Sequence, residues 1–145
     1  MQAQEFVSHS VEDTLRIGRA FGAELSEGSV VALVGDLGAG KTHFVKGVAA
    51  SQGVDPGAVS SPTFTIAHVY HGALEVHHLD CYRLEDEAEL VRTGAHEVIG
   101  VEGISLIEWP QRIEALLPEE TILVSIRHAG ATERHIRILF PESHA

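Results

Sequence analysis

The sequence contains little cysteine and little positive charge, and each shortage excludes a class of protein. One cysteine among 145 residues rules out an internal disulfide or a cysteine-rich metal site, so the chain is not a small disulfide-stapled scaffold. Ten lysines and arginines against 21 acidic residues give a formal net charge of −11. RNA, DNA and anionic lipids are bound largely through their phosphates. If a nucleic acid is involved in the function, we therefore expect a partner to hold it.

Long apolar runs are also absent from the sequence. No run approaches the roughly 18 residues of a membrane-spanning helix, and the first residues, MQAQE, do not resemble a leader sequence. We therefore expect a cytoplasmic protein. The chain has 44% hydrophobic and 21% charged residues, a composition typical of globular proteins. It has no repeats or linkers, so we expect residues 1–145 to form a single domain.

Helical and strand-like segments alternate along the chain. The elements expected are, in chain order, a helix that starts after Ser10 and runs toward Leu25, a buried strand at 30–34, a helix from about Lys41 to Ser51, a hairpin of 63–70 and 74–80, a short helix at 86–92 closed by Gly94, a buried strand at 104–107, a helical start at Pro110, and a hairpin of 121–127 and 134–140. Continuous apolar runs suit parallel strands that are buried on both faces. The combination predicts an α/β domain with three layers and a mixed sheet that includes hairpins.

A glycine-rich segment, GDLGAGKT, fits the phosphate-loop pattern G-x-x-x-x-G-K-[ST] and lies between a predicted buried strand and a predicted helix. Glycines allow the backbone N–H groups and the helix N-terminus to face phosphate oxygens. The lysine can reach the β- and γ-phosphates, and the threonine hydroxyl can bind Mg²⁺. The flanking elements favour this interpretation over a plain glycine turn, and the fold expected is P-loop NTPase-like. The residues of the loop are Gly35, Asp36, Leu37, Gly38, Ala39, Gly40, Lys41 and Thr42.

The lysines indicate which nucleotide is bound. GTPases of this type usually read guanine with an aspartate two residues after a lysine, because a carboxylate accepts hydrogen bonds from the guanine N–H groups. The only lysines are Lys41 and Lys46, and neither has an aspartate at that spacing. The sequence therefore favours ATP over GTP.

Two acidic residues, Asp80 and Glu108, qualify for a magnesium site. Glu108 follows the apolar run 104–107, and ligands bind at the carboxyl ends of such buried parallel strands. Asp80 follows a more polar, hairpin-like run. We predict Glu108 as the principal metal ligand and Asp80 as a second acid that positions water. The alternative is that one of them caps an element or pairs with Arg83.

Three further features have more than one interpretation. Residues 60–65, SSPTFT, are either a nucleotide-sensing loop or a proline turn that enters a strand. Trp109, the only tryptophan, could cover the site, contact a partner or belong to the core. The histidines show no metal-binding motif, so we interpret them as surface or hydrogen-bonded residues, with His77 and His78 on opposite faces of a strand.

Four motifs together resemble one protein family. They are GDLGAGKT at 35–42, SPTFT at 61–65, HLDCYRL at 78–84 and LIEWP at 106–110. In this order they are similar to the TsaE family, formerly YjeE, of bacterial ATPases in tRNA threonylcarbamoyladenosine synthesis. The resemblance covers nearly the whole chain, from the helix at Ser10 to the strand with Arg134.

The resemblance implies that the chain binds ATP and Mg²⁺, hydrolyses ATP slowly alone and associates with TsaB and TsaD. TsaD would transfer the threonylcarbamoyl group to the adenosine beside the anticodon, and hydrolysis would support repeated cycles. The alternatives are a small P-loop kinase and a non-catalytic nucleotide-dependent adaptor. The residues that the resemblance assigns are Thr42 and Glu108 as metal ligands, Thr63 in a switch-like loop, Asp80 as the second acid, Trp109 after the metal acid, and Arg134 and Val11 near the nucleotide.

Overall fold

The computed structural model describes residues 2–35, 40–59 and 67–141. Their elements are β1 (Gln2–Ser8), α1 (Val11–Gly22), β2 (Val30–Gly35), α2 (Lys41–Ser51), η1 (Pro56–Ala58), β3 (Ala67–Tyr70), β4 (Val76–Asp80), α3 (Glu87–Thr93), η2 (Ala95–Val98), β5 (Ile104–Glu108), η3 (Pro110–Leu116), β6 (Ile122–His128) and β7 (Arg134–Phe140), where η denotes a 3₁₀ helix. Among these elements there is no helix of the length and hydrophobicity that a membrane span requires.

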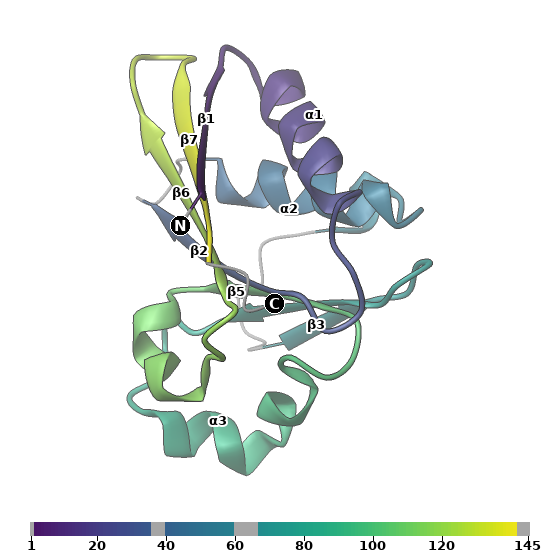
Figure 1. The fold of residues 1–145 in the computed structure, drawn as a ribbon, viewed down its shortest axis with the longest axis vertical. Helices are drawn as coiled ribbons and strands as arrows, with labels where there is room; N and C mark the ends of the chain where they lie inside the picture. The colour runs from purple at the N-terminus through teal and green to yellow at the C-terminus, as the bar shows by residue number, and fades with distance from the viewer. Residues whose placement is uncertain (1, 36–39, 60–66, 142–145) are drawn as a thin grey trace.

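One mixed sheet contains all of these strands, in the order β1-β7-β6-β2-β5-β4-β3 (Figure 1). The pairs β6–β2, β2–β5 and β5–β4 are parallel, while β3, β7 and β1 are joined to their neighbours by antiparallel pairs. The register of β4 and β5 sets Asp80 opposite Glu108. The parallel strands therefore bring both predicted acids to the same edge of the sheet.

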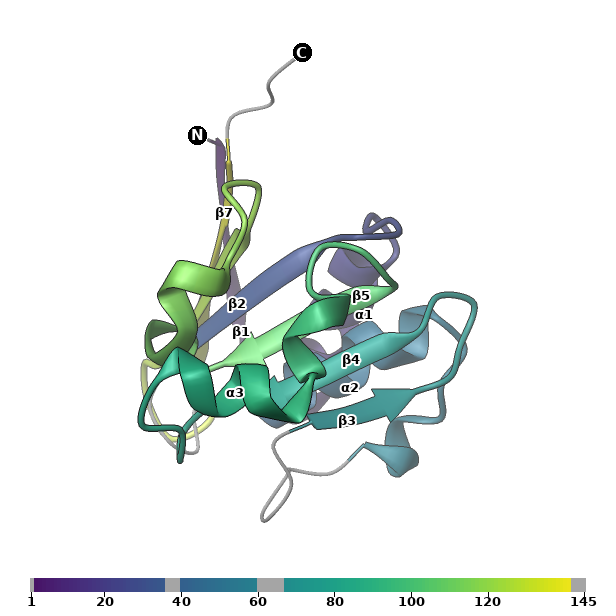
Figure 2. The same cartoon turned by 90° about the horizontal axis from the view of Figure 1, so that it is seen from below.

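Helices cover both faces of the sheet, which gives three layers (Figures 1 and 2). Helices α1 and α2 lie on one face, where Phe44 packs in a core cluster with Leu33 and Leu106. On the other face, Leu90 of α3 belongs to a second cluster with Ile107. The predicted three-layer α/β architecture with a mixed sheet is confirmed.

Most of the predicted elements are present in the structure. Helix α1 begins where expected, because the Ser10 hydroxyl accepts a hydrogen bond from the Asp13 N–H at 3.0 Å. Helix α3 ends at Gly94, which adopts the left-handed conformation. The strands at 30–34 and 104–107, the helix at Lys41 and the terminal hairpin are confirmed within one or two residues.

Two features differ from the predictions. Strand β1 was not expected, because it has no apolar alternation and every residue except Ser8 is exposed. It forms through its antiparallel pairing with β7, which the local sequence does not encode. The expected hairpin of 63–70 and 74–80 is present as β3 and β4, with residues 60–66 outside the described ranges. Its second strand is also an interior strand, because β4 pairs in parallel with β5.

Glycines bring the backbones of α1 and α2 into close contact. A Cβ atom on Gly47 would lie 2.2 Å from the carbonyl oxygen of Leu15, and one on Gly18 would lie 2.5 Å from that of Phe44. Displacing backbone atoms in a packed interior costs free energy. Because α1 starts at Val11 and α2 at Lys41, this crossing sets the distance between the two helix N-termini.

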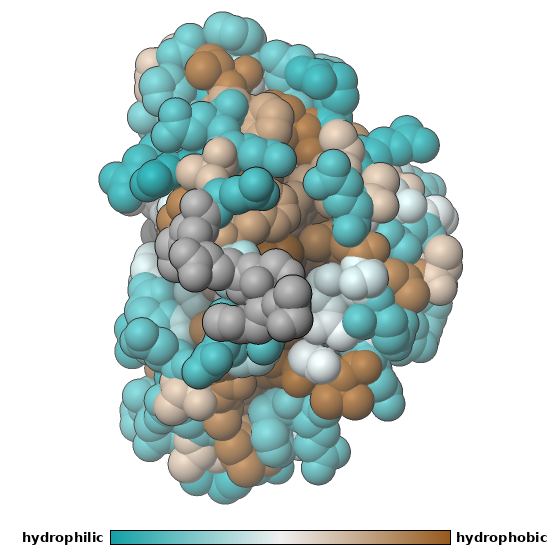
Figure 3. Space-filling view, in the orientation of Figure 1, coloured by the Kyte–Doolittle hydropathy of each residue, from teal (hydrophilic) through white to brown (hydrophobic). Residues whose placement is uncertain are grey.

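The surface is largely hydrophilic on the face shown in Figure 3, with hydrophobic residues between the polar ones. Among the described residues, the large hydrophobic side chains that are exposed are Phe6, Val7, Val11, Val69, Tyr82, Val91 and Val101. Two of them, Val11 and Tyr82, line the pocket described next.

Candidate functional site

A pocket of about 540 Å³ opens where the carboxyl ends of β4 and β5 meet the N-termini of α1 and α2. This volume is in the range of small-molecule sites. The predicted site residues that line it are Val11, Gly40, Lys41, Thr42, Asp80, Glu108, Trp109 and Arg134. The structure therefore brings together residues from five separate segments of the chain.

The remaining predicted site residues are Gly35 and five residues outside the described ranges. Gly35 ends β2, and its carbonyl oxygen accepts a hydrogen bond from Lys41 Nζ at 3.0 Å. Asp36, Leu37, Gly38, Ala39 and Thr63 lie outside the described residues.

The N-terminus of α2 faces this pocket. Gly40 caps the helix with φ at 100°, a left-handed conformation in which a Cβ atom would be strained. The first N–H groups of a helix have no partner within the helix, and the helix dipole is positive at this end. With Gly40, Lys41 and Thr42 in the lining, this end of the pocket suits an anion.

Lys41 lies between a carboxylate and an aromatic ring. Its side chain is 7% exposed, and Nζ is 3.8 Å from Oε1 of Glu108. Nζ also lies 4.7 Å from the centre of the Trp109 ring, within the range of a cation–π contact. The ammonium group is thus held at the carboxyl edge of the sheet by contacts from β2, β5 and the residue after β5.

A buried histidine orients the predicted metal ligand. His78 Nε2 is 2.6 Å from Oε2 of Glu108, and the His78 side chain is fully buried. The two Glu108 oxygens thus face different partners, His78 and Lys41. The sequence predicts His78 only as a surface or hydrogen-bonded histidine, and the second description is correct, but its partner was not predicted. The signal that could have identified it is its spacing, since His78 and Asp80 are two apart and share a face of β4.

Asp80 lies on β4, directly opposite Glu108 of β5. Its Oδ1 accepts a hydrogen bond from the Tyr82 N–H at 3.0 Å. Burial raises the pKa of the Asp80 carboxyl, the Tyr82 N–H lowers it, and the nearby Glu108 carboxylate raises it further. The net direction is upward, as expected for an acid that is partly buried beside a second acid.

We predict that replacing Asp80 stabilises the fold above acidic pH. A carboxyl whose pKa is raised in the folded state stabilises that state below its ordinary pKa, 3.8, and the stability is lost as the pH rises through the raised value. Asp80→Asn keeps an oxygen for the Tyr82 N–H but removes the charge. Urea unfolding should show the variant more stable than the wild type near pH 7, with a smaller difference near pH 4. A variant that is less stable near pH 7 would contradict this.

Trp109 adopts a strained backbone conformation at the pocket. Its φ of 57° is the only positive φ of a non-glycine residue in the described part of the chain, and such a conformation costs roughly 1–3 kcal/mol. The ring packs against Tyr82, with ring centres 4.9 Å apart, and lines the pocket with it. Trp109 also packs against the core cluster that contains Leu84 and Leu90, so its position fits both the interpretation that it covers the site and the interpretation that it belongs to the core.

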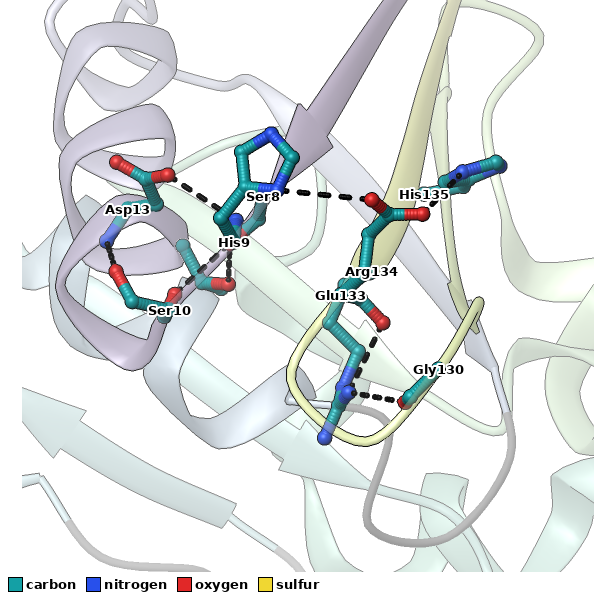
Figure 4. A network of polar contacts seen from close by, with 9 residues as sticks. Ser8, His9, Ser10, Asp13, Gly130, Glu133, Arg134 and His135 are labelled. Atoms are coloured by element: carbon teal, nitrogen blue, oxygen red, sulfur yellow. Dashed lines mark hydrogen bonds and ion pairs between the residues drawn. The ribbon is translucent and has the colours of Figure 1, made fainter.

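The junction between β1 and α1 meets the β6–β7 turn at the other side of the pocket (Figure 4). Arg134 Nη1 donates to the carbonyl oxygen of Glu133 at 3.0 Å and to that of Gly130 at 3.5 Å. His9 Nδ1 is 3.6 Å from a carboxylate oxygen of Glu133. The pairing of Ser8 with Arg134 between β1 and β7 places Arg134 close to the start of α1.

Several lining residues were not predicted. They are His9, Ser10, Glu12, Thr14, His43, Tyr82, Ala131 and Thr132. His9 and Ser10 lie between β1 and α1, a junction that follows the unexpected strand β1, and Glu12 and Thr14 lie in the first turns of α1. Tyr82 lies two residues after Asp80 in the HLDCYRL motif. This short separation is the sequence signal that could have placed Tyr82 near the site.

Most of the chain matches one protein family. A family model described as threonylcarbamoyl adenosine biosynthesis protein TsaE matches residues 8–136. The tRNA threonylcarbamoyladenosine biosynthesis protein TsaE of Treponema pallidum is 44% identical over 91% of this chain and 97% of its own length. The protein of the same name from Bacillus subtilis is also 44% identical, over 86% of this chain and 78% of its own.

A solved structure agrees with these sequence relatives. The crystal structure of Bacillus subtilis YdiB is similar with a TM-score of 0.80 and 33% sequence identity, and the match covers 97% of this chain and 87% of that one. The α/β fold with a phosphate loop, the four motifs in order and the family match lead to one conclusion. The chain belongs to the TsaE family, whose function is in tRNA threonylcarbamoyladenosine biosynthesis.

Proposed function

We propose that this chain binds ATP with Mg²⁺ in the pocket and hydrolyses it, and that hydrolysis supports threonylcarbamoyladenosine modification of tRNA in a complex with TsaB and TsaD. Family membership supports the pathway. The observation that carries the proposal is the meeting of Lys41 and Thr42 with Asp80 and Glu108 in one pocket at the N-terminus of α2.

The side chains present fit a nucleotide with a magnesium ion. Thr42, Asp80 and Glu108 offer a hydroxyl and two carboxylates, and oxygen ligands of this kind are those that Mg²⁺ prefers. Thr42 and Glu108 would hold the ion. When bound, Mg²⁺ neutralises charge on the phosphate oxygens.

Each remaining residue has a proposed role in binding or positioning. Lys41 and the first N–H groups of α2 bind the phosphates, because both present positive charge to the pocket. Asp80 orients the attacking water. Val11, Trp109 and Arg134 contact other parts of the nucleotide, Val11 near the adenine. His78 positions Glu108 through the hydrogen bond at 2.6 Å.

We propose slow hydrolysis by the isolated chain. Phosphoryl transfer is usually accelerated by an arginine that contacts the phosphates. Arg134 is the only arginine among the described residues of the pocket lining, and its Nη1 donates to two backbone carbonyls. Docking of a partner would complete the site. The net charge of −11 disfavours direct binding of tRNA phosphates by this chain, which supports the proposal that the partners hold the tRNA.

The sole tryptophan offers a direct test of nucleotide binding. Trp109 lies beside Lys41 in the pocket, so a nucleotide that contacts Lys41 should change its fluorescence. We expect a saturable change with ATP and Mg²⁺, with weaker binding of GTP. Lys41→Ala should weaken binding at least about tenfold, because a charge-assisted hydrogen bond is lost.

Lys46→Ala is the matched control, since Lys46 is the other lysine of α2 and does not line the pocket. Its affinity should equal that of the wild type. Equal affinities for Lys41→Ala and the wild type would contradict the proposed phosphate site.

Two other functions would use a similar pocket. A small kinase would transfer the phosphoryl group to an acceptor, and a phosphorylated product in place of free phosphate would identify it. Kinases place several cationic groups around the phosphoryl group, which the single described arginine of this pocket does not favour. A non-catalytic adaptor would support tRNA modification without turnover, so a variant that binds ATP but does not hydrolyse it would remain active.

A further inference from the structure

Three side chains with metal-ligating atoms meet near the amino ends of β4 and β5, the ends opposite to the pocket. Glu75 directly precedes β4, His77 lies on β4, and Glu102 lies two residues before β5. One ligating atom from each residue lies within 4.8 Å of the other two. None of the three residues lines the pocket.

Within the described ranges, one nitrogen of His77 is buried and has no hydrogen-bond partner. The residue is 6% exposed, and no described residue lies within hydrogen-bond distance of its Nε2. The nearest carboxylate oxygen, Oε2 of Glu75, lies 3.6 Å away, which is too far for a hydrogen bond. Among the described residues, His78 Nδ1, His96 Nδ1 and Ser105 Oγ are also buried without a partner, but of these four atoms only His77 Nε2 belongs to a group with two carboxylates. A buried polar atom without a partner calls for an explanation.

The backbone holds the two carboxylates beside this nitrogen. The Glu75 carbonyl accepts a hydrogen bond from the Ile104 N–H at 2.8 Å. Gly103 has φ at 60°, and a Cβ atom there would lie 2.2 Å from the same carbonyl. The segments that carry Glu75 and Glu102 are therefore fixed against each other before any ion binds.

The second carboxylate oxygen of Glu75, Oε1, contacts another histidine. His71 Nδ1 lies 3.2 Å from Oε1 of Glu75, while Oε2 faces His77. This arrangement leaves Oε2 available as a ligand. The carboxylate of Glu27 lies close by as well, where its Oε1 accepts from the Gly103 N–H at 2.8 Å, and it adds to the negative charge around the site.

The donor set matches a borderline transition metal. Zn²⁺ binds imidazole nitrogen and carboxylate oxygen at about 2.0–2.2 Å, so two ligands of a tetrahedral site lie about 3.3–3.5 Å apart. The observed 3.6 Å between His77 Nε2 and Glu75 Oε2 differs from this by a few tenths of an ångström. Mg²⁺ and Ca²⁺ prefer oxygen ligands alone, so the buried nitrogen selects against them.

We propose that Glu75, His77 and Glu102 form a binding site for a divalent transition-metal ion of the Zn²⁺ class, separate from the nucleotide pocket. The ion gives the buried His77 nitrogen a partner and neutralises the two carboxylates. It also ties the start of β4 to the segment that precedes β5.

The test is calorimetric titration of the metal-free full-length chain with Zn²⁺, together with thermal unfolding with and without Zn²⁺. We expect one tight site per chain and a higher melting temperature with Zn²⁺, because an ion that binds only the folded state stabilises it. Glu102→Gln should weaken the tight site at least about tenfold and remove most of the thermal shift. His77→Gln should do the same.

Controls separate this site from other residues that bind metal ions. Glu97→Gln changes another exposed acid, and His43→Gln changes a histidine of the pocket. Both should bind Zn²⁺ like the wild type. Glu102→Gln is exposed and should fold normally, so it tests the proposal even if His77→Gln is unstable. No tight site in the wild type, or equal affinity in Glu102→Gln, would overturn the proposal.

Discussion

Glu108→Gln should lower the rate of ATP hydrolysis by about 10²- to 10³-fold, the loss typical of removing one electrostatic contact from a transition state. The glutamine keeps the shape of the side chain and an oxygen or amide for His78. The change removes the charge that we propose binds Mg²⁺ and that lies 3.8 Å from Lys41 Nζ. Binding of ATP without metal should not weaken, because a carboxylate near the phosphates is removed.

The rate is measured as phosphate release at saturating ATP and Mg²⁺, with Trp109 fluorescence for the affinity. Glu114→Gln is the matched control, since Glu114 is an exposed acid on η3 just after the same strand. Its rate should equal that of the wild type. If Glu108→Gln hydrolyses ATP at the wild-type rate, Glu108 does not take part in the chemistry.

Gly47→Ala should destabilise the fold by about 1–3 kcal/mol, the usual cost of overpacking a core. Alanine in a helix interior would otherwise gain about 1 kcal/mol over glycine. The new Cβ would lie 2.2 Å from the Leu15 carbonyl oxygen and 2.8 Å from the Arg19 nitrogen. Since both are backbone atoms, α1 and α2 must separate. Lys41 and Thr42 begin α2, so nucleotide binding should weaken as well.

Urea unfolding gives the change in stability, and the Trp109 titration gives the change in affinity. Gly57→Ala is the control, because Gly57 is exposed and a Cβ there would approach only the Asp55 side chain, at 3.3 Å. It should leave both quantities close to the wild type. A Gly47→Ala protein of unchanged or higher stability would show that the helices do not depend on this close approach.

The phosphate loop and the buried strands could be predicted from sequence because their signals are local. Eight consecutive residues carry the loop pattern, and the run before Glu108 is apolar without interruption, as expected for a strand covered on both faces. The caps of α1 and α3 are likewise encoded by single residues, Ser10 and Gly94. These features place Lys41 and Glu108 at the carboxyl edge of a sheet.

Other parts of the site depend on contacts between distant segments. The hydrogen bond of His78 to Glu108 follows from the register of β4 and β5, and a strand pairing is not written in either strand alone. The same is true of β1, which is held by β7 and carries the chain to His9 at the pocket. The close crossing at Gly18 and Gly47 likewise becomes visible only when α1 meets α2.

Asp80 and Glu108 illustrate the difference between what the local sequence predicts and what strand pairing adds. Their sequence context ranked Glu108 above Asp80, because its strand is more apolar. The parallel pairing of β4 with β5 sets the two residues opposite each other, and both line the pocket. The raised pKa of Asp80 is partly a result of that proximity. We propose that Glu108 is the metal ligand and that Asp80 positions water, and each role therefore has to be tested with its own variant.

The central claim, that this pocket hydrolyses ATP in support of a modification complex, is tested most directly by phosphate release from the purified chain, alone and then with TsaB and TsaD. We expect slow release by the chain alone and faster release with both partners, with Lys41→Ala and Glu108→Gln close to background in either case. Release that the partners do not change, or that survives in both variants, would contradict the account.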